Sequence, residues 1–155
     1  CSSDLEYQDP KSKSYANSLE AELLERWLKS YTEHWPEAPV SIGVIAPYRG
    51  QVDTLQNLWT PSLWPDHLTV DINTIDSYQG QERDLIVLSL VRSNDSGEIG
   101  FLKDLRRLNV AITRGRKQVV IIGDSATLGH HRFYQALLPY VETHGRWISA
   151  WEYMV

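Results

Sequence analysis

The stretch "RRLNVAITRGRK", residues 106–117, has the residue types and spacing for chemistry on phosphates. It carries five basic side chains and no acidic one. If it is helical, Arg107 and Arg114 lie seven residues apart near one face, and Arg114 stands at the helix end, directly before Gly115. An arginine held on a rigid element can stabilise charge on a transferring phosphoryl group. The alternative is that these arginines complement the helix dipole and solvate the surface.

Two further polar stretches, "APYRGQ" (residues 46–51) and "DSYQGQE" (residues 76–82), each place a glycine next to a glutamine. Backbone N–H groups beside glycine can approach a phosphate or a sugar closely. Each stretch follows an apolar run typical of a strand, and open parallel sheets bind ligands beyond the carboxyl ends of their strands. We therefore expect both stretches at that edge of a sheet.

Two common phosphate-binding motifs are missing from this sequence. Neither G-x-x-x-x-G-K-[ST], the Walker A loop, nor G-x-G-x-x-G occurs in the 155 residues. The chain therefore cannot cradle a triphosphate in the usual way. This argues against a complete stand-alone NTPase.

The elements that position these residues are predicted to form a parallel α/β sheet. Short apolar runs rich in branched residues indicate strands that are covered on both faces. Four such runs occur, and they alternate with segments of helical periodicity, at residues 40–47, 68–75, 85–91 and 118–124. A short strand near residues 147–153 should complete the sheet.

Helices are predicted before, between and after these strands. Asn17 followed by Glu20 has the form of an N-cap, and the helix it opens should end near residues 31–33. A short helix should follow Asp124, and Pro139 should kink or restart the next one. Three further apolar faces have helical spacing: Val52, Leu55 and Leu58; Leu105, Leu108 and Ile112; and Phe133, Leu137 and Val141. The first sixteen residues are polar and lack periodicity.

Composition places the chain among reduced, intracellular proteins and excludes several classes. The length suits one domain, Cys1 is the only cysteine, and no run of 18 apolar residues could span a membrane. A net charge of -5 argues against a protein that coats nucleic acid through bulk positive charge. The only methionine is Met154. We therefore interpret the sequence as a piece of a longer protein, with residues 1–16 arriving from an upstream part and residues 17–155 forming the domain.

Four co-linear motifs resemble a known family. "IGVIAPYRGQV", "NTIDSYQGQERDLIVLSLVRSN", "GEIGFLKDLRRLNVAITRGRK" and "VVIIGD" resemble the second RecA-like domain of superfamily 1B helicases. The resemblance is closest to the Upf-like group that includes the immunoglobulin-mu-binding-protein helicases, and it covers residues 14–153. It implies a three-layer RecA-like fold, in which a mainly parallel sheet is flanked by helices.

The resemblance also implies roles for particular residues. Arg114 is similar to the motif VI arginine that contacts the γ-phosphate across a cleft between two RecA-like domains. Glu82 and Gly80 match the motif V positions near the ribose and γ-phosphate, and Gln79 and Arg107 look like supporting residues. Pro47, Tyr48 and Thr74 match positions that face nucleic acid. Two departures from the family pattern are Gly115, where an alanine is common, and Pro139.

The implied activity is ATP-dependent movement along a nucleic-acid strand. ATP and Mg²⁺ would be bound mainly by an upstream RecA-like domain, so the isolated fragment is expected to be inactive. The implied partners are single-stranded DNA or RNA and that upstream domain, with no membrane, no metal held by this fragment and no oligomer. Family analogy suggests 5′ to 3′ movement.

Several of these assignments have simpler structural alternatives, and the function has alternatives too. Tyr48 can be a packed tyrosine rather than a base-stacking one, Thr74 has the same two readings, and Arg107 can simply pair with Asp104. A helicase-like binding or interaction module without catalysis is the main functional alternative. A flavodoxin-like small-molecule binder would explain the sheet but not the arginine-rich helix.

Overall fold

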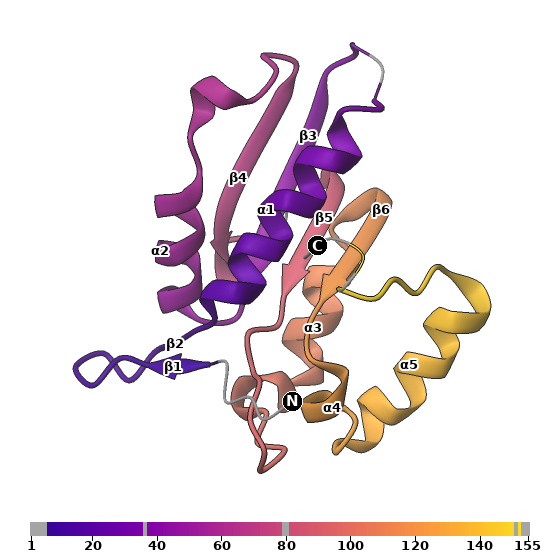
Figure 1. Ribbon diagram of the computed structural model, residues 1–155. Helices are drawn as coiled ribbons and strands as arrows, with labels where there is room; N and C mark the ends of the chain where they lie inside the picture. The colour runs from indigo at the N-terminus through magenta and orange to yellow at the C-terminus, as the bar shows by residue number, and fades with distance from the viewer. Residues whose placement is uncertain (1–5, 36, 79–80, 151, 153–155) are drawn as a thin grey trace.

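The computed structural model describes residues 6–35, 37–78, 81–150 and 152 of the chain. Its centre is a four-stranded sheet in the order β4-β3-β5-β6 (Figure 1). All three neighbouring pairs are parallel. The strands are Val40–Ala46 (β3), Leu68–Thr74 (β4), Arg83–Ser89 (β5) and Gly115–Ile122 (β6). The predicted parallel α/β fold is confirmed.

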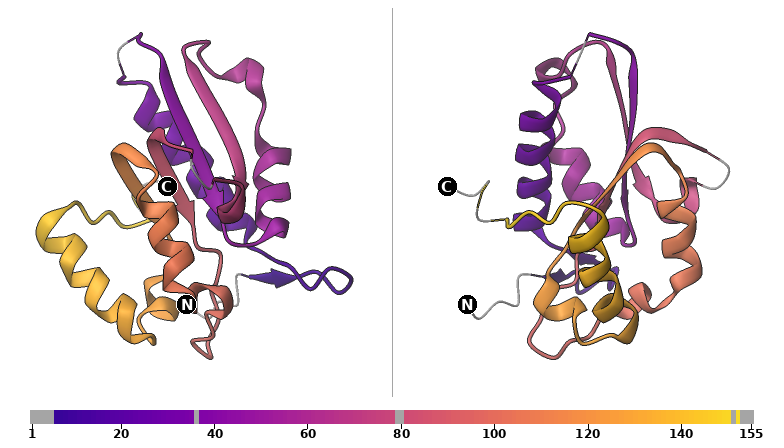
Figure 2. Two further views of the ribbon diagram at one scale, coloured as in Figure 1. Left: turned by 180° about the vertical axis from the view of Figure 1, so that it is seen from behind. Right: turned by 90° about the vertical axis from the view of Figure 1, so that its right-hand side faces the viewer.

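Helices lie on both faces of the sheet, which gives three layers (Figure 2, right). One face is covered by α1 and α2, and the other by α3. The helices α4 and α5 follow β6 and pack near its carboxyl end (Figure 1). The bounds are Ser18–Thr32 (α1), Arg49–Leu58 (α2), Leu105–Ile112 (α3), Ser125–Leu128 (α4) and Arg132–His144 (α5).

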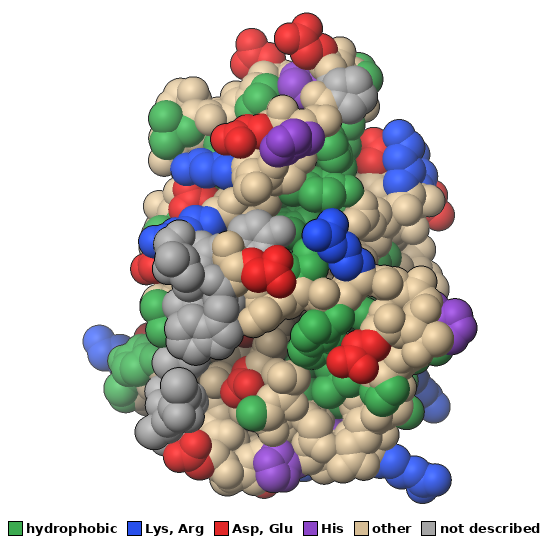
Figure 3. Space-filling view, turned by 45° about the vertical axis from the view of Figure 1, so that its right-hand side comes forward, with side chains coloured by type: hydrophobic (Ala, Val, Ile, Leu, Met, Phe, Trp, Pro, Cys, Tyr) green, Lys and Arg blue, Asp and Glu red, His purple; other side chains and the backbone are tan. Residues whose placement is uncertain are grey.

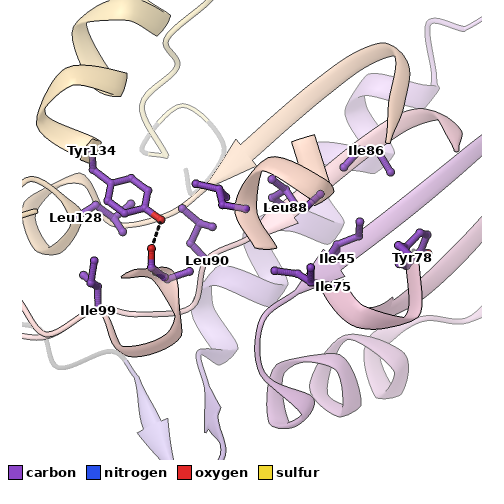
Figure 4. Packing of buried hydrophobic residues seen from close by; sticks show 12 residues of the cluster. Ile45, Ile75, Tyr78, Ile86, Leu88, Leu90, Ile99, Leu128 and Tyr134 are labelled. Carbon is purple, nitrogen blue, oxygen red and sulfur yellow. Dashed lines mark hydrogen bonds between the residues drawn. The ribbon is translucent and has the colours of Figure 1, made fainter. Parts of the chain in front are cut away.

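The central strand β5 supplies side chains to two separate hydrophobic clusters. Leu85 and Val87 pack with α1 and α2, whereas Ile86 and Leu88 pack on the α3 side. Successive side chains of a strand point to opposite faces, so a continuous apolar run can fill two cores. Figure 4 shows the second cluster, where Tyr134 from α5 closes the side near the carboxyl ends of the strands.

Helix α1 begins as its capping signature predicts. The Asn17 side chain accepts a hydrogen bond from the Glu20 N–H at 3.0 Å. Pro139 is predicted to kink or restart α5; the helix runs through it as one element, so it does not restart there. The carbonyl four residues earlier belongs to Gln135, which is exposed. Water can therefore take the place of the hydrogen bond that proline removes.

The two ends of the chain differ from the sequence prediction. Tyr7–Gln8 (β1) and Tyr15–Ala16 (β2) form a small antiparallel pair. Asp9 starts its turn by accepting hydrogen bonds from two backbone N–H groups, at 2.6 and 3.0 Å. The strands are too short to produce a detectable alternation of apolar residues.

The predicted final strand is wrong over residues 147–150, which have no strand in the structure; Trp151 and Tyr153 lie outside the described residues. Aromatic and branched residues favour strands only where a neighbouring strand can pair with them.

Along the face of the molecule shown in Figure 3, hydrophobic side chains form a strip with acidic and basic side chains around it.

A buried polar network joins α1, α2 and the end of β5. The Glu20 carboxylate accepts hydrogen bonds from the Ser89 hydroxyl at 2.7 Å and from the Val91 N–H at 2.8 Å. Gln51, in the first turn of α2, donates to Ser89 at 3.0 Å and accepts from the Asn17 N–H at 2.8 Å. Burial raises the pKa of Glu20 to about 7, although the hydrogen bonds from Ser89 and Val91 oppose the rise.

The Glu20 carboxylate should make the stability of this chain depend on pH near neutrality. Its pKa is about 7 in the folded protein, against the ordinary glutamate value of 4.5 expected in the unfolded chain. Folding therefore favours the protonated form, and the free energy of unfolding falls as pH rises through 7. We expect a loss of about 2 to 3 kcal/mol between about pH 5 and pH 8 from this group.

Denaturant unfolding across that pH range tests this expectation. Glu20→Gln should remove most of the fall, because its amide does not titrate and its carbonyl oxygen can still accept both hydrogen bonds. The matched control is Glu22→Gln, an exposed position on the same helix, which should keep the pH dependence of the unsubstituted chain. Parallel pH profiles for the unsubstituted chain and Glu20→Gln would contradict the assignment.

Candidate functional site

Arg114 and Glu82 are neighbours at the amino ends of β5 and β6. The Arg83 N–H donates to the Arg114 carbonyl at 2.9 Å, and Arg83 pairs with Gly115 in the sheet. Glu82 directly precedes this pair and is exposed. The two residues that the sequence assigns to the nucleotide therefore belong to one edge, which we call the amino edge.

The placement of "DSYQGQE" corrects the expectation that all of it lies beyond the carboxyl ends of the strands. Only its first residues follow β4. Because β4 and β5 are parallel and lie on either side of β3, the chain must return to the opposite edge before β5 begins. A 3-10 turn over Ile75–Tyr78 begins this return. Gln79 and Gly80 lie outside the described residues.

Arg114 lies just beyond α3 rather than on it. The helix ends at Ile112, and the Arg114 N–H donates to the Ala111 carbonyl at 3.2 Å. Gly115 opens β6, so the departure from the family pattern at this position falls on a strand and not on a helix end. A Cβ at Gly115 would lie 2.6 Å from Val119 Cγ2, which shows how closely the backbone is packed beside Arg114.

The Arg114 side chain is half-buried and its Nε atom is buried without a hydrogen-bond partner. Among the described residues no carboxylate forms an ion pair with its guanidinium. A buried N–H group without a partner costs about 1 to 3 kcal/mol, so such groups are normally satisfied. This arginine therefore has unused capacity to bind an anion.

The other basic side chains of the amino edge are already paired. Arg83 contacts Asp71 at 2.6 Å, and Asp84 lies 3.6 Å from Arg116 and 3.8 Å from Lys117. The backbone hydrogen bond from Ser41 lowers the pKa of Asp84, with the two basic neighbours contributing in the same direction. Asp84 is therefore an anion at neutral pH.

Arg107 is separated from Arg114 by the length of α3. Its Nε atom lies 3.6 Å from Asp76 and 3.6 Å from Asp104, and all three side chains are about half exposed. Asp104 also caps α3 by accepting hydrogen bonds from two N–H groups of its first turn. The pairing with Asp104 that the sequence offered as an alternative is thus present, and a second carboxylate joins it.

The predicted nucleic-acid residues gather at the opposite edge, which we call the carboxyl edge. Ala46, which precedes Pro47, pairs with Thr74 in the sheet. Pro47 and Thr74 are both partly buried, and the Thr74 hydroxyl oxygen lies 3.3 Å from that of Ser77. The structure thus brings Pro47 and Thr74 to one edge and places Arg114 and Glu82 at the other.

Tyr48 is packed inside the carboxyl edge, with only 4% of its surface exposed. Its ring stacks on Phe101, with centroids 5.2 Å apart, and meets Tyr15 edge-on at 5.3 Å. Its hydroxyl accepts hydrogen bonds from Arg92 and from the Phe101 N–H, both at 3.3 Å. In this structure the ring has no free face for a base, which matches the packed alternative.

Sequence reasoning did not single out Arg92 or Glu6, which form a buried ion pair behind Tyr48. Arg92 Nε donates to Glu6 at 2.8 Å and a second guanidinium nitrogen donates at 3.1 Å. The guanidinium also lies over the Tyr15 ring, 4.1 Å from its centroid. A charged residue directly after a buried strand is a signal for Arg92, but no single-sequence pattern identifies a partner 86 residues away.

Within the part of the chain that the structure describes, none of the helices combines the length and the apolar character that a membrane span requires. Within the same residues, no group of three His, Cys, Asp or Glu side chains is arranged to hold a metal ion.

The chain is similar to a family model and to several known proteins. A family model described as an AAA domain matches residues 1–126. The DNA-binding protein SMUBP-2 of Rattus norvegicus is 39% identical over 150 residues, which are 97% of this chain and 15% of that protein. A regulator of nonsense transcripts 1 homolog of Neurospora crassa is 43% identical over 129 residues, covering 81% of this chain and 12% of that protein.

A third relative is the DNA polymerase alpha-associated DNA helicase A of Saccharomyces cerevisiae. It is 53% identical over 89 residues, covering 57% of this chain and 13% of that protein. The chain therefore spans less than a fifth of the length of each of these relatives. Among solved structures, a phosphoethanolamine N-methyltransferase of Haemonchus contortus has a TM-score of 0.46 at 14% identity, over 85% of this chain and 29% of that one. That likeness is too low to carry an argument.

The ion pair behind Tyr48 should be important for stability. The Arg92 and Glu6 side chains are only 6% and 11% exposed. Glu6→Ala would leave a buried arginine without its partner, and we expect it to lower the free energy of unfolding by about 3 to 5 kcal/mol. Denaturant unfolding of the chain measures this loss.

Glu98→Ala is the control, because it removes an ion pair with Lys103 whose side chains are 65% and 59% exposed. It should cost less than about 1 kcal/mol. The double variant Glu6→Leu with Arg92→Met should recover much of the lost stability, since neither charge then remains buried alone. Equal effects of Glu6→Ala and Glu98→Ala would contradict this role.

Proposed function

The chain belongs to the AAA domain family, with relatives among the Upf-like helicases of superfamily 1B, and from this premise we propose that it is the second motor domain of an ATP-dependent nucleic-acid helicase or translocase. The proposal concerns a longer protein, because the chain spans only 15% of its rat relative. A first motor domain would precede this one and share the ATP site with it.

The observation that carries the proposal is the unpaired guanidinium of Arg114. The Arg114 side chain is half-buried, the exposed Glu82 belongs to the same edge of the sheet, and the Arg114 Nε atom has no partner among the described residues. A planar guanidinium matches the geometry of phosphate oxygens and can bind two of them at once. The residues present therefore fit a nucleotide phosphate.

In this proposal the two residues of the amino edge have different roles. Arg114 would hold the terminal phosphate and stabilise the negative charge that develops on it during hydrolysis. Glu82 would contact the ribose or position water near the phosphate. ATP would arrive with Mg²⁺ bound mainly by the first motor domain, since this sequence has no G-x-x-x-x-G-K-[ST] loop. The isolated chain would accordingly be inactive.

The carboxyl edge would contact single-stranded nucleic acid. Pro47 and Thr74 meet there at the ends of β3 and β4. An acidic chain is compatible with this role, because a motor needs only a narrow path along the strand. The choice between DNA and RNA depends on contacts with the 2′-OH of the sugar.

The role of Arg114 can be tested in the full-length protein. We expect Arg114→Ala to reduce strand-stimulated ATP hydrolysis by about 10³- to 10⁵-fold while leaving the unfolding transition in place. Arg116→Ala is the matched control, because Arg116 is an exposed arginine two residues away that pairs with Asp84. Near-normal turnover in Arg114→Ala would overturn the assignment. No turnover in the unsubstituted full-length protein would instead favour a helicase-like binding module without catalysis.

A further inference from the structure

Phe101 presents an exposed aromatic ring at the carboxyl edge. The residue is 57% exposed, and its ring stacks on the buried ring of Tyr48 with an interplanar angle of 27°. One face of Phe101 is therefore covered by protein, and exposure of this size leaves the other side open to solvent. The sequence pattern pointed to Tyr48 as the aromatic residue for stacking, but the outer ring of this pair is Phe101.

The segment that carries Phe101 is fixed from two sides. It is a 3-10 turn over Gly100–Lys103. The Tyr48 hydroxyl accepts a hydrogen bond from the Phe101 N–H at 3.3 Å, and the Tyr134 hydroxyl donates to the Leu102 carbonyl at 3.0 Å (Figure 4). Leu102 is itself only 2% exposed. The ring is thus presented by a segment anchored both to Tyr48, the residue that caps the start of α2, and to Tyr134 of α5.

Gly100 lets this turn approach Tyr48 closely. Its φ is +51°, a conformation that residues with a side chain rarely adopt, and an added Cβ would lie 2.6 Å from the Tyr48 hydroxyl and 2.5 Å from the Arg92 guanidinium. The chain therefore places an apolar ring outward at a position where the backbone is tightly constrained. An exposed ring held in this way costs little further ordering when a ligand stacks on it.

We propose that Phe101 is the stacking platform for a base of single-stranded nucleic acid at the carboxyl edge. This inference rests on the proposed function, because Pro47 and Thr74 of the same edge are the residues assigned to the strand. Phe101 reaches that edge through Tyr48, which directly follows Pro47. Aromatic rings stack on every base, so the contact would tolerate any sequence.

The surroundings of Phe101 suit a base better than a protein surface. Leu105, four residues further along the chain, is the next exposed large apolar side chain, at 38% exposure, and two such side chains are far less than a stable protein interface needs. Arg106 follows in the first turn of α3; it is exposed and forms no ion pair among the described residues. A free arginine near an open ring offers a contact for the phosphate that accompanies a base.

The experiment measures strand binding by the full-length protein with Phe101→Ala, Phe101→Leu and Phe101→Tyr. Fluorescence anisotropy with labelled single-stranded DNA and RNA oligonucleotides, each at several salt concentrations, gives the affinity and its salt slope. We expect Phe101→Ala to weaken binding about 5- to 150-fold, with Phe101→Leu similar and Phe101→Tyr close to normal. The salt slope should stay unchanged, because stacking displaces no phosphate counterions.

Tyr140→Ala is the matched control, since Tyr140 is an aromatic residue on α5 with 59% exposure. It should bind strands normally. Phe101→Leu and Phe101→Tyr both keep a large side chain packed on Tyr48. The difference in strand affinity between these two variants therefore tests stacking even if Phe101→Ala fails to fold.

Three results would overturn the inference. Unchanged affinity in Phe101→Ala and Phe101→Leu would show that the ring serves another contact, such as a protein surface. Normal binding by Phe101→Leu with weak binding by Phe101→Ala would show apolar packing without stacking. In both cases the proposed function would stand, because the unsubstituted protein binds strands. Absence of strand binding by the unsubstituted protein would overturn the inference together with the proposed function.

Discussion

The Glu20 carboxylate joins three segments that the sheet alone does not hold together. Its hydrogen bonds to Ser89 and to the Val91 N–H attach the first turn of α1 to the end of β5, and Gln51 extends the network to α2. Val91 has a φ of +73°, which is strained for a residue branched at Cβ. The buried Glu20 carboxylate stabilises the Val91 backbone in that conformation by accepting its N–H. The next residue, Arg92, then donates a hydrogen bond to the Tyr48 hydroxyl.

The carboxyl edge and the amino edge of the domain are connected through α3. The helix begins near the carboxyl edge, where Arg107 pairs with Asp76, and ends at Ile112, two residues before Arg114 at the amino edge. Its eight residues span about 12 Å. One face of the helix is fixed to the sheet through Leu108 and Ala111. The helix is therefore one continuous element between the two edges.

The sequence predicted the parts of this molecule that depend on local pattern. The apolar runs predict the carboxyl ends of β3, β4, β5 and β6 to within two residues, and the Asn17 cap predicts the start of α1. Pattern could not show that Glu82 lies at the amino edge, because that follows from the strand order and the short return between β4 and β5. Nor could it show that Tyr48 is buried while Phe101 is exposed, since both follow apolar or small residues.

Long-range partners were equally hidden from local reasoning. Glu6 and Arg92 form a pair only because the polar opening segment folds back as β1 and β2 beside Tyr48. No residue near either of them in the sequence indicates that the two form an ion pair. The assignment of Arg114 rests on motif similarity, to which the structure adds a buried Nε atom without a partner.

The opening segment also bears on where this domain starts. Judged by strands and helices of the main sheet, the fold begins at α1, and a chain trimmed to Asn17 would retain all of them. Such a chain would lose the Glu6 carboxylate, the Tyr15 ring and the Ser14 hydroxyl that accepts from the Gly50 N–H at 2.8 Å. The buried Arg92 guanidinium would then remain charged without the Glu6 carboxylate that pairs with it. The stabilising contacts of the fold therefore extend back at least to Glu6, a dozen residues before its first helix.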